Sequence, residues 1–527
     1  MDTSTPFRTE DLQSTARLPK TMASLSRLWH GDALLLTGLV VIVAVIHVSV
    51  PGPVPTGADA GNWLALANEA RGLDVMSAEV RYPPLFPALI AFLLQMNVSP
   101  IVALLMMALV AKTALVVAVY MSARTLNRTY AVMAATLVAT AGAQMEAYAW
   151  GAYPQLLAMA FGLMAVFLIL RYIDTQERSH LLSGLVLVAA TLATHILIGG
   201  LLALVIGIAV LHWLYMVDPP GRVWRRGIKL GAAVTGATAV GGLVLFFLSR
   251  GPGTETTLNP QALSRWEALS HVFRDAPVPW AAIGVVAVVV LFFRSWPAHV
   301  AATLAVGSAW AVTSAAFFLI TGEQRGLLVF QVGLILLAIV GFVAAREYVV
   351  GPEKRRYSVD EPRTVRHRLL LVAGISMFFA IVVAGLAAYV SAVDWYRVVD
   401  RAEIAALDHL KQDARFADVV VAARGHNGNP AGWWVEGYAE LPTWTGVDLE
   451  FLAFPKEREQ AEVANSIFGG ELSDAETIAL LRQIGADYLV VDRRGPDAAW
   501  LDSELARSLP VLDDTSHLVI LEARPRG

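Results

Sequence analysis

The stretch 101-IVALLMMALVAKTALVVAVY-120 has one charged residue, Lys112, in twenty consecutive positions. The hydrocarbon core of a bilayer is about 30 Å thick, and roughly 20 apolar residues of helix are needed to cross it. The stretch therefore predicts a membrane-spanning helix. An ionisable residue inside such a helix needs a partner or a water-filled cavity, which makes Lys112 a residue to follow in the structure.

Comparable apolar runs recur along the first three quarters of the chain. The 527 residues are 56% hydrophobic and 16% charged, whereas soluble domains have about 45–50% apolar and roughly 25% charged residues. We expect a mainly α polytopic membrane protein with about 11 transmembrane helices. The expected spans are 33–50, 101–123, 130–147, 154–170, 181–195, 197–216, 228–249, 280–293, 298–320, 326–345 and 369–391.

One apolar stretch, 83-PPLFPALIAFLLQM-96, is short and begins with two prolines. It is better suited to an interfacial or re-entrant helix than to a crossing. With this stretch left out, loops such as 218-DPPGRVWRRGIK-229 and 346-REYVVGPEKRRYSVDEPRTVRHR-368 face the same side as the N-terminus. The loops between spans on that side hold sixteen Arg and Lys residues, and those on the opposite side hold six. The positive-inside rule then predicts a multi-pass protein of the cytoplasmic (inner) membrane with a cytoplasmic N-terminus.

The chain divides into three parts by composition. Residues 1–31 form a tail, residues 32–393 the transmembrane part with a first outer loop at 51–100, and residues 394–527 an extracytoplasmic α/β domain. In the last part we expect strands at 417–423, 487–492 and 517–523 and helices near 456–468 and 473–484. The chain has no cysteine, which excludes disulfides and thiolate metal sites, and a net charge of −4 gives no reason to expect a nucleic acid partner.

The first outer loop carries an acidic residue, Asp59, within 57-GADAGNW-63. A helical run begins there, and Asn62 and Glu69 fall on the same face of it as Asp59. A carboxylate at a membrane surface can act as a general base or as a metal ligand. It can equally cap the helix through its side-chain oxygen, and the two roles are compatible.

Basic residues on the outer face are candidates for binding a phosphate. Arg81 begins 81-RYPPLFP-87, and Arg325 follows Glu323 at the outer end of a helix. A guanidinium fork suits phosphate oxygens, but Arg81 could also extend to lipid headgroups, and Arg325 could form a structural salt bridge with Glu323. His195 lies where an outer hairpin turns, and a lone His there is more often structural than ligand-binding.

Aromatic residues gather in two places on the outer side. Glu146, Tyr148, Trp150 and Tyr153 lie in an expected turn, 146-EAYAWGAYPQ-155, and could line an acceptor pocket or belong to the ordinary interfacial aromatic belt. The second place is 432-GWWVEGYAELPTWTG-446. There Trp433, Trp434 and Glu436 could form a platform for a glycan or acceptor, or the tryptophans could be core or docking residues.

The arrangement of 57-GADAGNW-63 followed by 81-RYPPL-85 and a short apolar helix resembles the GT-C membrane glycosyltransferases, which include the protein O-mannosyltransferases and the transferases that add aminoarabinose to lipid A. Segments 153–172 and 321–338 are similar to the outer-turn and late-helix segments of that superfamily. The segment 432–446 also resembles the WWDYG signature of oligosaccharyltransferase catalytic subunits. Because Val435 replaces the Asp of that signature, peptide binding is not carried over.

The resemblance implies transfer of a sugar from a polyprenyl-phosphate carrier to a glycan, lipid or protein acceptor on the outer face, with inversion. It matches Asp59 to the general base and Arg81 and Arg325, with His195, to binding of the donor phosphate. The lipid-linked sugar is then the donor substrate. A single acidic motif favours catalysis without a metal, although a divalent cation is possible. The candidates for a sugar or acceptor pocket are Asn62, Glu69, Tyr82, Glu146, Tyr148, Trp150, Tyr153, Glu323, Trp433, Trp434 and Glu436.

Two other classes of protein fit a polytopic chain. A transporter or lipid flippase would be expected to show internal repeats and paired broken helices at mid-membrane depth, which the sequence does not display. An envelope-assembly protein with the same fold but no catalytic activity would share every motif above. Only an activity assay separates that protein from an enzyme.

Overall fold

The computed structural model of the protein describes residues 22–73, 82–217, 221–249, 297–321, 325–350, 365–415, 417–449, 452 and 455–524. Within these residues, eight helices contain a stretch that is long and apolar enough to cross a membrane. They are α2 (Met22–Ser49), α5 (Pro100–Ala123), α8 (Tyr153–Thr175), α10 (Ile196–Val217), α11 (Gly221–Ser249), α14 (Ala298–Thr321), α15 (Arg325–Val350) and α16 (Val365–Tyr396). The chain is a multi-pass membrane protein.

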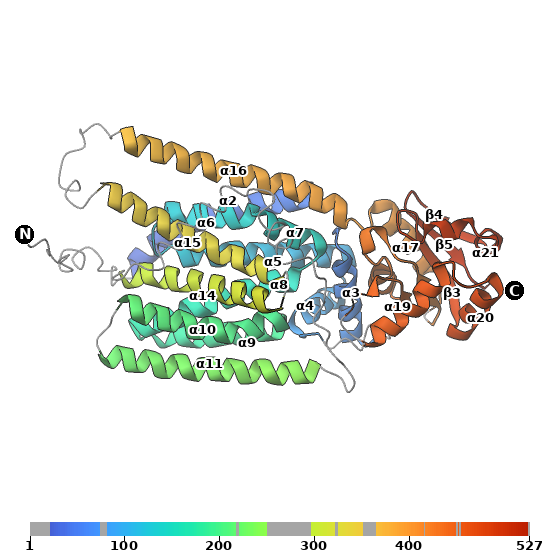
Figure 1. Ribbon diagram of the computed structural model, residues 1–527, viewed down its shortest axis with the longest axis horizontal. Helices are drawn as coiled ribbons and strands as arrows, with labels where there is room; N and C mark the ends of the chain where they lie inside the picture. Colours follow the sequence, from blue (N-terminus) through green and yellow to red (C-terminus); the bar gives the residue numbers. More distant parts are fainter. Residues whose placement is uncertain are drawn as a thin grey trace, which may run out of the picture.

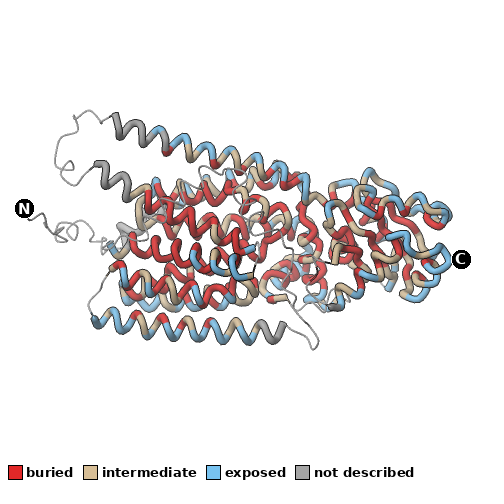
Figure 2. The backbone as a smooth tube through the Cα atoms, viewed as in Figure 1, coloured by how far each residue is buried: buried red, intermediate tan, exposed pale blue. Residues whose placement is uncertain are grey.

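The long helices form a bundle with α11 and α16 at its two edges and α5, α8, α14 and α15 further inside (Figure 1). Burial follows this order, because the inner helices are buried along most of their length and the edge helices are exposed on their outward faces (Figure 2). The exposed side chains are apolar. Val240 of α11 is 61% exposed and Phe379 of α16 is 59% exposed, which is the surface that lipid solvates in a membrane-spanning bundle.

The expected count of 11 spans is not reached by the described residues. The expected span 181–195 is α9 (Arg178–Thr194), a helix of 17 residues that packs on α8 and α10. The span expected at 130–147 is two helices, α6 (Arg128–Thr140) and α7 (Gly142–Trp150). The remaining expected span, 280–293, lies outside the described residues.

The break between α6 and α7 has a visible cause. Ala141 has extended backbone angles, so the last carbonyl groups of α6, that of Val138 among them, lack their ordinary helical partners. Lys112 of α5 donates from Nζ to the carbonyl oxygen of Gln144 at 3.2 Å and lies 3.5 Å from that of Val138. Lys112 therefore has its partners in backbone carbonyls, and on the other side Gly385 of α16 packs directly on Thr140.

The short apolar stretch of the first loop does not cross the bundle. It forms α4 (Leu85–Gln95), whose 11 residues span roughly 16 Å at 1.5 Å per residue. This is about half the thickness of a bilayer core, as the sequence led us to expect. Together with α3 (Ala58–Ala70), α4 lies at the end of the bundle that faces the C-terminal unit (Figure 1).

The C-terminal unit is a small α/β domain built on a five-stranded sheet with the order β2-β1-β3-β5-β4. β1 is parallel to β2 and β3, while β5 is antiparallel to β3 and β4. The strands are β1 (Val419–Ala422), β2 (Thr443–Thr445), β3 (Ala486–Asp492), β4 (Val511–Asp514) and β5 (Leu518–Glu522). The helices are α17 (Arg401–Asp413), α18 (Gly432–Trp434), α19 (Pro455–Phe468), α20 (Asp474–Ile484) and α21 (Glu504–Ser508), with a π-helix, η4 (Val435–Ala439), and 3-10 helices η3 (His426–Gly428) and η6 (Ala498–Asp502).

The three strands and two helices expected in this unit correspond to β1, β3, β5, α19 and α20. The first helix, α17, follows α16 after a short linker and was not expected. Arg494 ties the linker down by donating to the carbonyl oxygens of Arg397 and Val398, at 3.2 and 2.7 Å. The sheet is thereby fastened to the end of the last membrane helix.

Candidate functional site

Asp59 lies in the first turn of α3, and the residue that precedes the helix as its N-cap is Gly57. The Asp59 side chain is therefore not the cap of this helix, which was one of the two roles open to it. A carboxylate in a first helical turn is favoured by the positive end of the helix dipole. Asp59 is thus presented at a helix N-terminus at the end of the bundle nearest the C-terminal unit (Figure 1).

The start of α3 is held against the turn between α7 and α8. Thr56 Oγ1 donates to the carbonyl oxygen of Ala149 at 2.7 Å, and Trp63 Nε1 donates to that of Gly151 at 2.7 Å. Gly151 has a φ of 100°, and a Cβ there would lie 2.9 Å from the amide nitrogen of Ala60. The expected turn at 146–155 is therefore confined to Gly151 and Ala152, because residues through Trp150 are helical.

Burial raises the pKa of the Asp59 carboxyl to about 6, and the nearby charge of Arg325 opposes this rise. Desolvation destabilises the ionised form, whereas a neighbouring cation stabilises it. The result is a carboxyl group that is ionised at neutral pH and accepts a proton more readily than an exposed aspartate does. This is the property required of a general base.

Four parts of the chain meet around Asp59. The charge of Arg325 at the start of α15 acts on Asp59 of α3, on Tyr82 just before α4 and on His195 between α9 and α10. The rings of Tyr82 and His195 are 6.0 Å apart, and the carbonyl oxygen of Arg325 accepts a hydrogen bond from Gln155 Nε2 at 3.3 Å. Burial lowers the pKa of His195, so its imidazole is neutral at pH 7 and does not serve as a cation.

A second group of rings lies beside these residues. Tyr153 is completely buried and its ring centroid is 5.3 Å from that of Tyr148. Glu146 accepts a hydrogen bond from the hydroxyl of Tyr396 at 3.1 Å, and the Tyr396 ring is 6.2 Å from that of Trp150. A Cβ at Gly151 would lie 3.0 Å from Cβ of Asp59, so the turn between Trp150 and Tyr153 packs against Asp59. The charge of Asp59 also acts on Tyr153 and Tyr396.

Three ring residues of this region were not singled out from the sequence. Tyr396 ends α16, Tyr389 lies two turns before it, and His47 lies near the end of α2. The His47 ring is 4.3 Å from Tyr148 and 5.1 Å from Tyr389. The sequence feature that could have identified them is a polar aromatic residue near the end of an apolar helix. Residues of the ordinary interfacial aromatic belt have the same feature, so it does not single out a site.

The other sequence candidates differ in how the structure describes them. Glu69 is exposed and ten residues further along α3 than Asp59, which is roughly 15 Å along the helix axis, so sharing a face does not bring the two carboxylates together. Asn62 is half-buried, and its Oδ1 has no hydrogen-bond partner among the described residues. Arg81 and Glu323 lie outside the described residues.

The aromatic segment of the C-terminal unit is not an exposed platform. Trp434 is completely buried, Glu436 is 1% exposed and Trp433 is half-buried. These residues belong to α18 and η4, which pack on α3. The tryptophans therefore lie where the docking interpretation puts them, between the C-terminal unit and α3. They do not form an open platform for a glycan.

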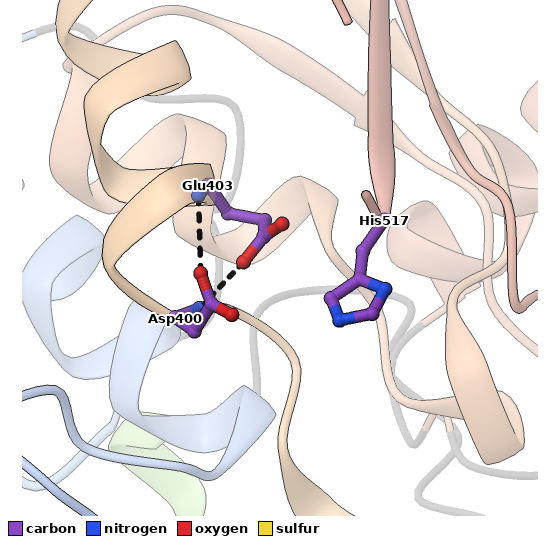
Figure 3. A group of neighbouring side chains, drawn as sticks. All are labelled: Asp400, Glu403 and His517. Carbon is purple, nitrogen blue, oxygen red and sulfur yellow. Dashed lines mark hydrogen bonds between the residues drawn. The ribbon is translucent and has the colours of Figure 1, made fainter. Parts of the chain in front are cut away.

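Among the described residues, one group of three side chains has the spacing of metal ligands: Asp400, Glu403 and His517, whose ligating atoms lie within 4.8 Å of one another. Figure 3 shows the imidazole facing the two carboxylates. Both carboxylates already cap α17, because Asp400 Oδ1 accepts from the amides of Ala402 and Glu403 and Glu403 Oε2 accepts from the amide of Asp400. This capping box accounts for the arrangement. Asp59 is not part of such a group.

The sequence matches no family model and no curated protein. Solved structures do resemble it. The archaeal oligosaccharyltransferase AglB from Archaeoglobus fulgidus, solved with an inhibitory peptide and a dolichol-phosphate, aligns with a TM-score of 0.55 and 12% identity over 89% of this chain and 71% of that one. An Archaeoglobus fulgidus oligosaccharyltransferase in the apo form aligns with a TM-score of 0.56 and 14% identity, over 88% of this chain and 71% of that one.

The arabinofuranosyltransferase AftD from Mycobacteria aligns with a TM-score of 0.55 and 16% identity over 93% of this chain and 40% of that one. AglB and AftD are both GT-C membrane glycosyltransferases. The chain therefore has the GT-C fold, as the resemblance of its sequence motifs implied.

Proposed function

We propose that this chain is a glycosyltransferase that moves a sugar from a polyprenyl-phosphate carrier to a hydroxyl acceptor at the extracytoplasmic face of the membrane. The observation that carries the proposal is the Asp59 carboxylate, half-buried in the first turn of α3 and under the charge of Arg325, with α3 at one end of a GT-C bundle. The solved relatives support a lipid carrier, since one was determined with a dolichol-phosphate.

In the proposed reaction, Asp59 accepts the proton of the acceptor hydroxyl as its oxygen attacks the anomeric carbon of the sugar. The bond between that carbon and the phosphate oxygen breaks, and polyprenyl phosphate leaves with the electron pair. Attack opposite the leaving group inverts the configuration. One general base suffices for this displacement, and the ionised form of Asp59 at neutral pH supplies it.

The departing phosphate gains negative charge, which the Arg325 guanidinium would stabilise from the start of α15. Arg81 is proposed for the same task on sequence grounds. The neutral imidazole of His195 can donate a hydrogen bond to a phosphate oxygen from the same side. Tyr82, Tyr148, Trp150, Tyr153 and Glu146 are proposed to border the sugar or acceptor, because the turn between Trp150 and Tyr153 packs against Asp59 and aromatic faces stack on sugar rings.

The proposed arrangement of the chain has residues 32–393 as the transmembrane part and 394–527 as an extracytoplasmic domain, with the N-terminus in the cytoplasm of a prokaryotic cell. Lys112 does not support the transporter alternative, because backbone carbonyls at the α6–α7 break provide its partners. The acceptor would be an envelope glycan, a lipid or a protein.

The test is incubation of the purified protein with labelled polyprenyl-phosphate mannose, arabinose, glucose and galactose, followed by detection of transferred label in an envelope fraction. Transfer from one donor, dependent on Asp59, is the expected result. Absence of transfer from all four, with a correctly folded protein, would favour the non-catalytic envelope-assembly protein. A parallel incubation with a chelator measures whether a divalent cation is required.

A further inference from the structure

The helix that carries Asp59 is also held from the side of the C-terminal unit. The residues involved are Gly432–Ala439, comprising α18 and the π-helix η4, and we call them the clamp segment. α3 packs on both of its helices. The contact joins residues more than 360 positions apart, so nothing in the local sequence of the first loop announces it.

The first contact is made at the beginning of α3. Trp434 is completely buried, and its indole Nε1 donates a 3.0 Å hydrogen bond to the carbonyl oxygen of Gly57. That carbonyl also accepts from the amide of Ala60. The indole is thus bonded to the residue that caps the helix, two positions before Asp59.

The second contact is a close approach of two backbones through glycines. A Cβ at Gly61 would lie 2.6 Å from the carbonyl carbon of Trp433 and 2.6 Å from the amide nitrogen of Trp434. A Cβ at Gly437 would meet the carbonyl oxygen of Gly61 and lie 2.8 Å from Cβ of Leu64. Only glycine permits such an approach, so the position of α3 relative to the clamp segment is fixed within narrow limits.

The third contact lies at the far end of α3. Asn68 Nδ2 donates to the carbonyl oxygen of Gly437 at 2.8 Å, and Arg71 forms a 3.2 Å ion pair with Glu440. Glu440 itself has a φ of 60° and also pairs with Lys411 at 3.0 Å. Both ends of α3 are therefore bonded to the clamp segment or to the residue that follows it.

We propose that the clamp segment is a positioning element of the site, in which Trp434 sets the place of the N-terminal turn of α3 and so of the Asp59 carboxylate. The inference rests on the proposed function. It assigns the C-terminal unit a role in catalysis that does not depend on binding the acceptor. A base held to within a fraction of an ångström is needed because small misplacement of reacting groups lowers rates steeply.

The test is Trp434→Phe, which keeps an aromatic ring and removes the hydrogen bond to Gly57. Trp500→Phe is the matched control. It is the same substitution in the same unit, but Trp500 packs on Phe468 in a separate core. We expect Trp434→Phe to lower kcat about tenfold with an unchanged KM for the lipid-linked donor, while Trp500→Phe leaves kcat near the wild-type value. Equal kcat values in the two variants would overturn the proposal.

A readout without catalysis separates this inference from the proposed function. Hydrogen exchange of the amides at residues 57–61 should accelerate in Trp434→Phe and not in Trp500→Phe. If Asp59→Asn keeps full activity but exchange accelerates as expected, the proposed base is wrong and the mechanical contact stands. If Asp59→Asn is inactive while exchange and kcat of Trp434→Phe match the control, the base stands and the clamp is overturned.

Asn68→Leu provides a second variant should Trp434→Phe fail to fold. The change removes the bond to Gly437 and the bond that Asn68 Oδ1 accepts from Arg71, and it keeps the number and branching of the side-chain heavy atoms. We expect it to lower kcat by a smaller factor than Trp434→Phe and to accelerate exchange at residues 66–70. Wild-type exchange in this variant would show that the clamp segment does not hold α3.

Discussion

The indole nitrogen of Trp63 in α3 donates a 2.7 Å hydrogen bond to the carbonyl oxygen of Gly151, which ends α7 eighty-eight positions later. This bond joins the helix that carries Asp59 to the helices that carry Glu146 and Tyr153. Gly151 can accept it because its φ of 100° turns the backbone where α7 ends and α8 follows. The geometry of the site thus depends on a residue with no side chain.

Gly151→Ala tests that dependence. Alanine is strained at a positive φ, and its Cβ would lie 2.9 Å from the amide nitrogen of Ala60 and 3.0 Å from Cβ of Asp59. We expect the free energy of unfolding to fall by about 2 kcal/mol or more from the strain and the contact together. We expect transfer activity per folded molecule to fall as well. Gly200→Ala is the control, since nothing lies within 4 Å of its added Cβ, and thermal unfolding in detergent compares the two. A melting temperature of Gly151→Ala equal to that of the control would contradict the account.

The rate of transfer should depend on the ionisation of Asp59. Burial raises the pKa of this carboxyl to about 6, and a general base must be ionised to accept a proton. We therefore expect kcat/KM to be constant above about pH 7 and to fall tenfold per pH unit well below pH 6. A pH profile measured with saturating acceptor checks this. A rate that stays constant down to pH 4.5 would remove Asp59 from the role of base.

The ionisation of Asp59 should also make stability depend on pH, but stability should fall where the rate of transfer rises. The folded-state pKa of Asp59 lies above its unfolded value of 3.8, so between these values the folded protein binds more protons than the unfolded chain. Stability that is present below about pH 4 is then lost as the pH rises through 6. Asp59→Asn is expected to melt at a higher temperature than the wild type at pH 8 and at a similar temperature at pH 4. A lower melting temperature at pH 8 would show that the charge of Asp59 is a net stabiliser.

Arg325 offers a prediction that separates charge from shape. Its charge lowers the pKa of Asp59, so Arg325→Gln should shift the acidic limb of the pH profile to higher pH. Loss of a phosphate partner should also raise the KM for the donor, and a charged hydrogen bond contributes about 1.5–3 kcal/mol, or roughly 10- to 100-fold. Arg325→Lys keeps the charge and should leave the limb near its wild-type position. An unchanged limb in Arg325→Gln would mean that Arg325 does not face Asp59.

The membrane part of the fold could be predicted from hydropathy because a bilayer imposes a minimum helix length. The runs at 101–123 and 154–170 show this, since they correspond to α5 and α8. The run at 130–147 shows the limit. It is as apolar as a span, yet the helix breaks at Ala141, where Lys112 of α5 donates to the carbonyl oxygen of Gln144 and Gly385 of α16 packs on Thr140.

The candidate site was predictable to the extent that each residue carries its own chemical signal. Asp59 stands out as a carboxylate in the first outer loop and Arg325 as a cation at the end of an apolar helix, and the charge of Arg325 acts on Asp59. Glu69 shares a helical face with Asp59 but lies ten residues further along α3. Sequence periodicity gives the angle between two side chains around the helix axis and not the distance between them along it. For Trp434 the sequence left a glycan platform and a core or docking role open, and it could not name the partner because Gly57 lies in another part of the chain.

The most direct test of the account is the turnover of Asp59→Asn with the polyprenyl-phosphate sugar that the wild-type protein accepts, measured in the same membranes and normalised to folded protein. Asparagine keeps the size of the side chain and cannot accept the acceptor proton. The account predicts a loss of at least about 100-fold in kcat with donor binding retained. Turnover within a few-fold of the wild type would contradict the assignment of Asp59 as the base.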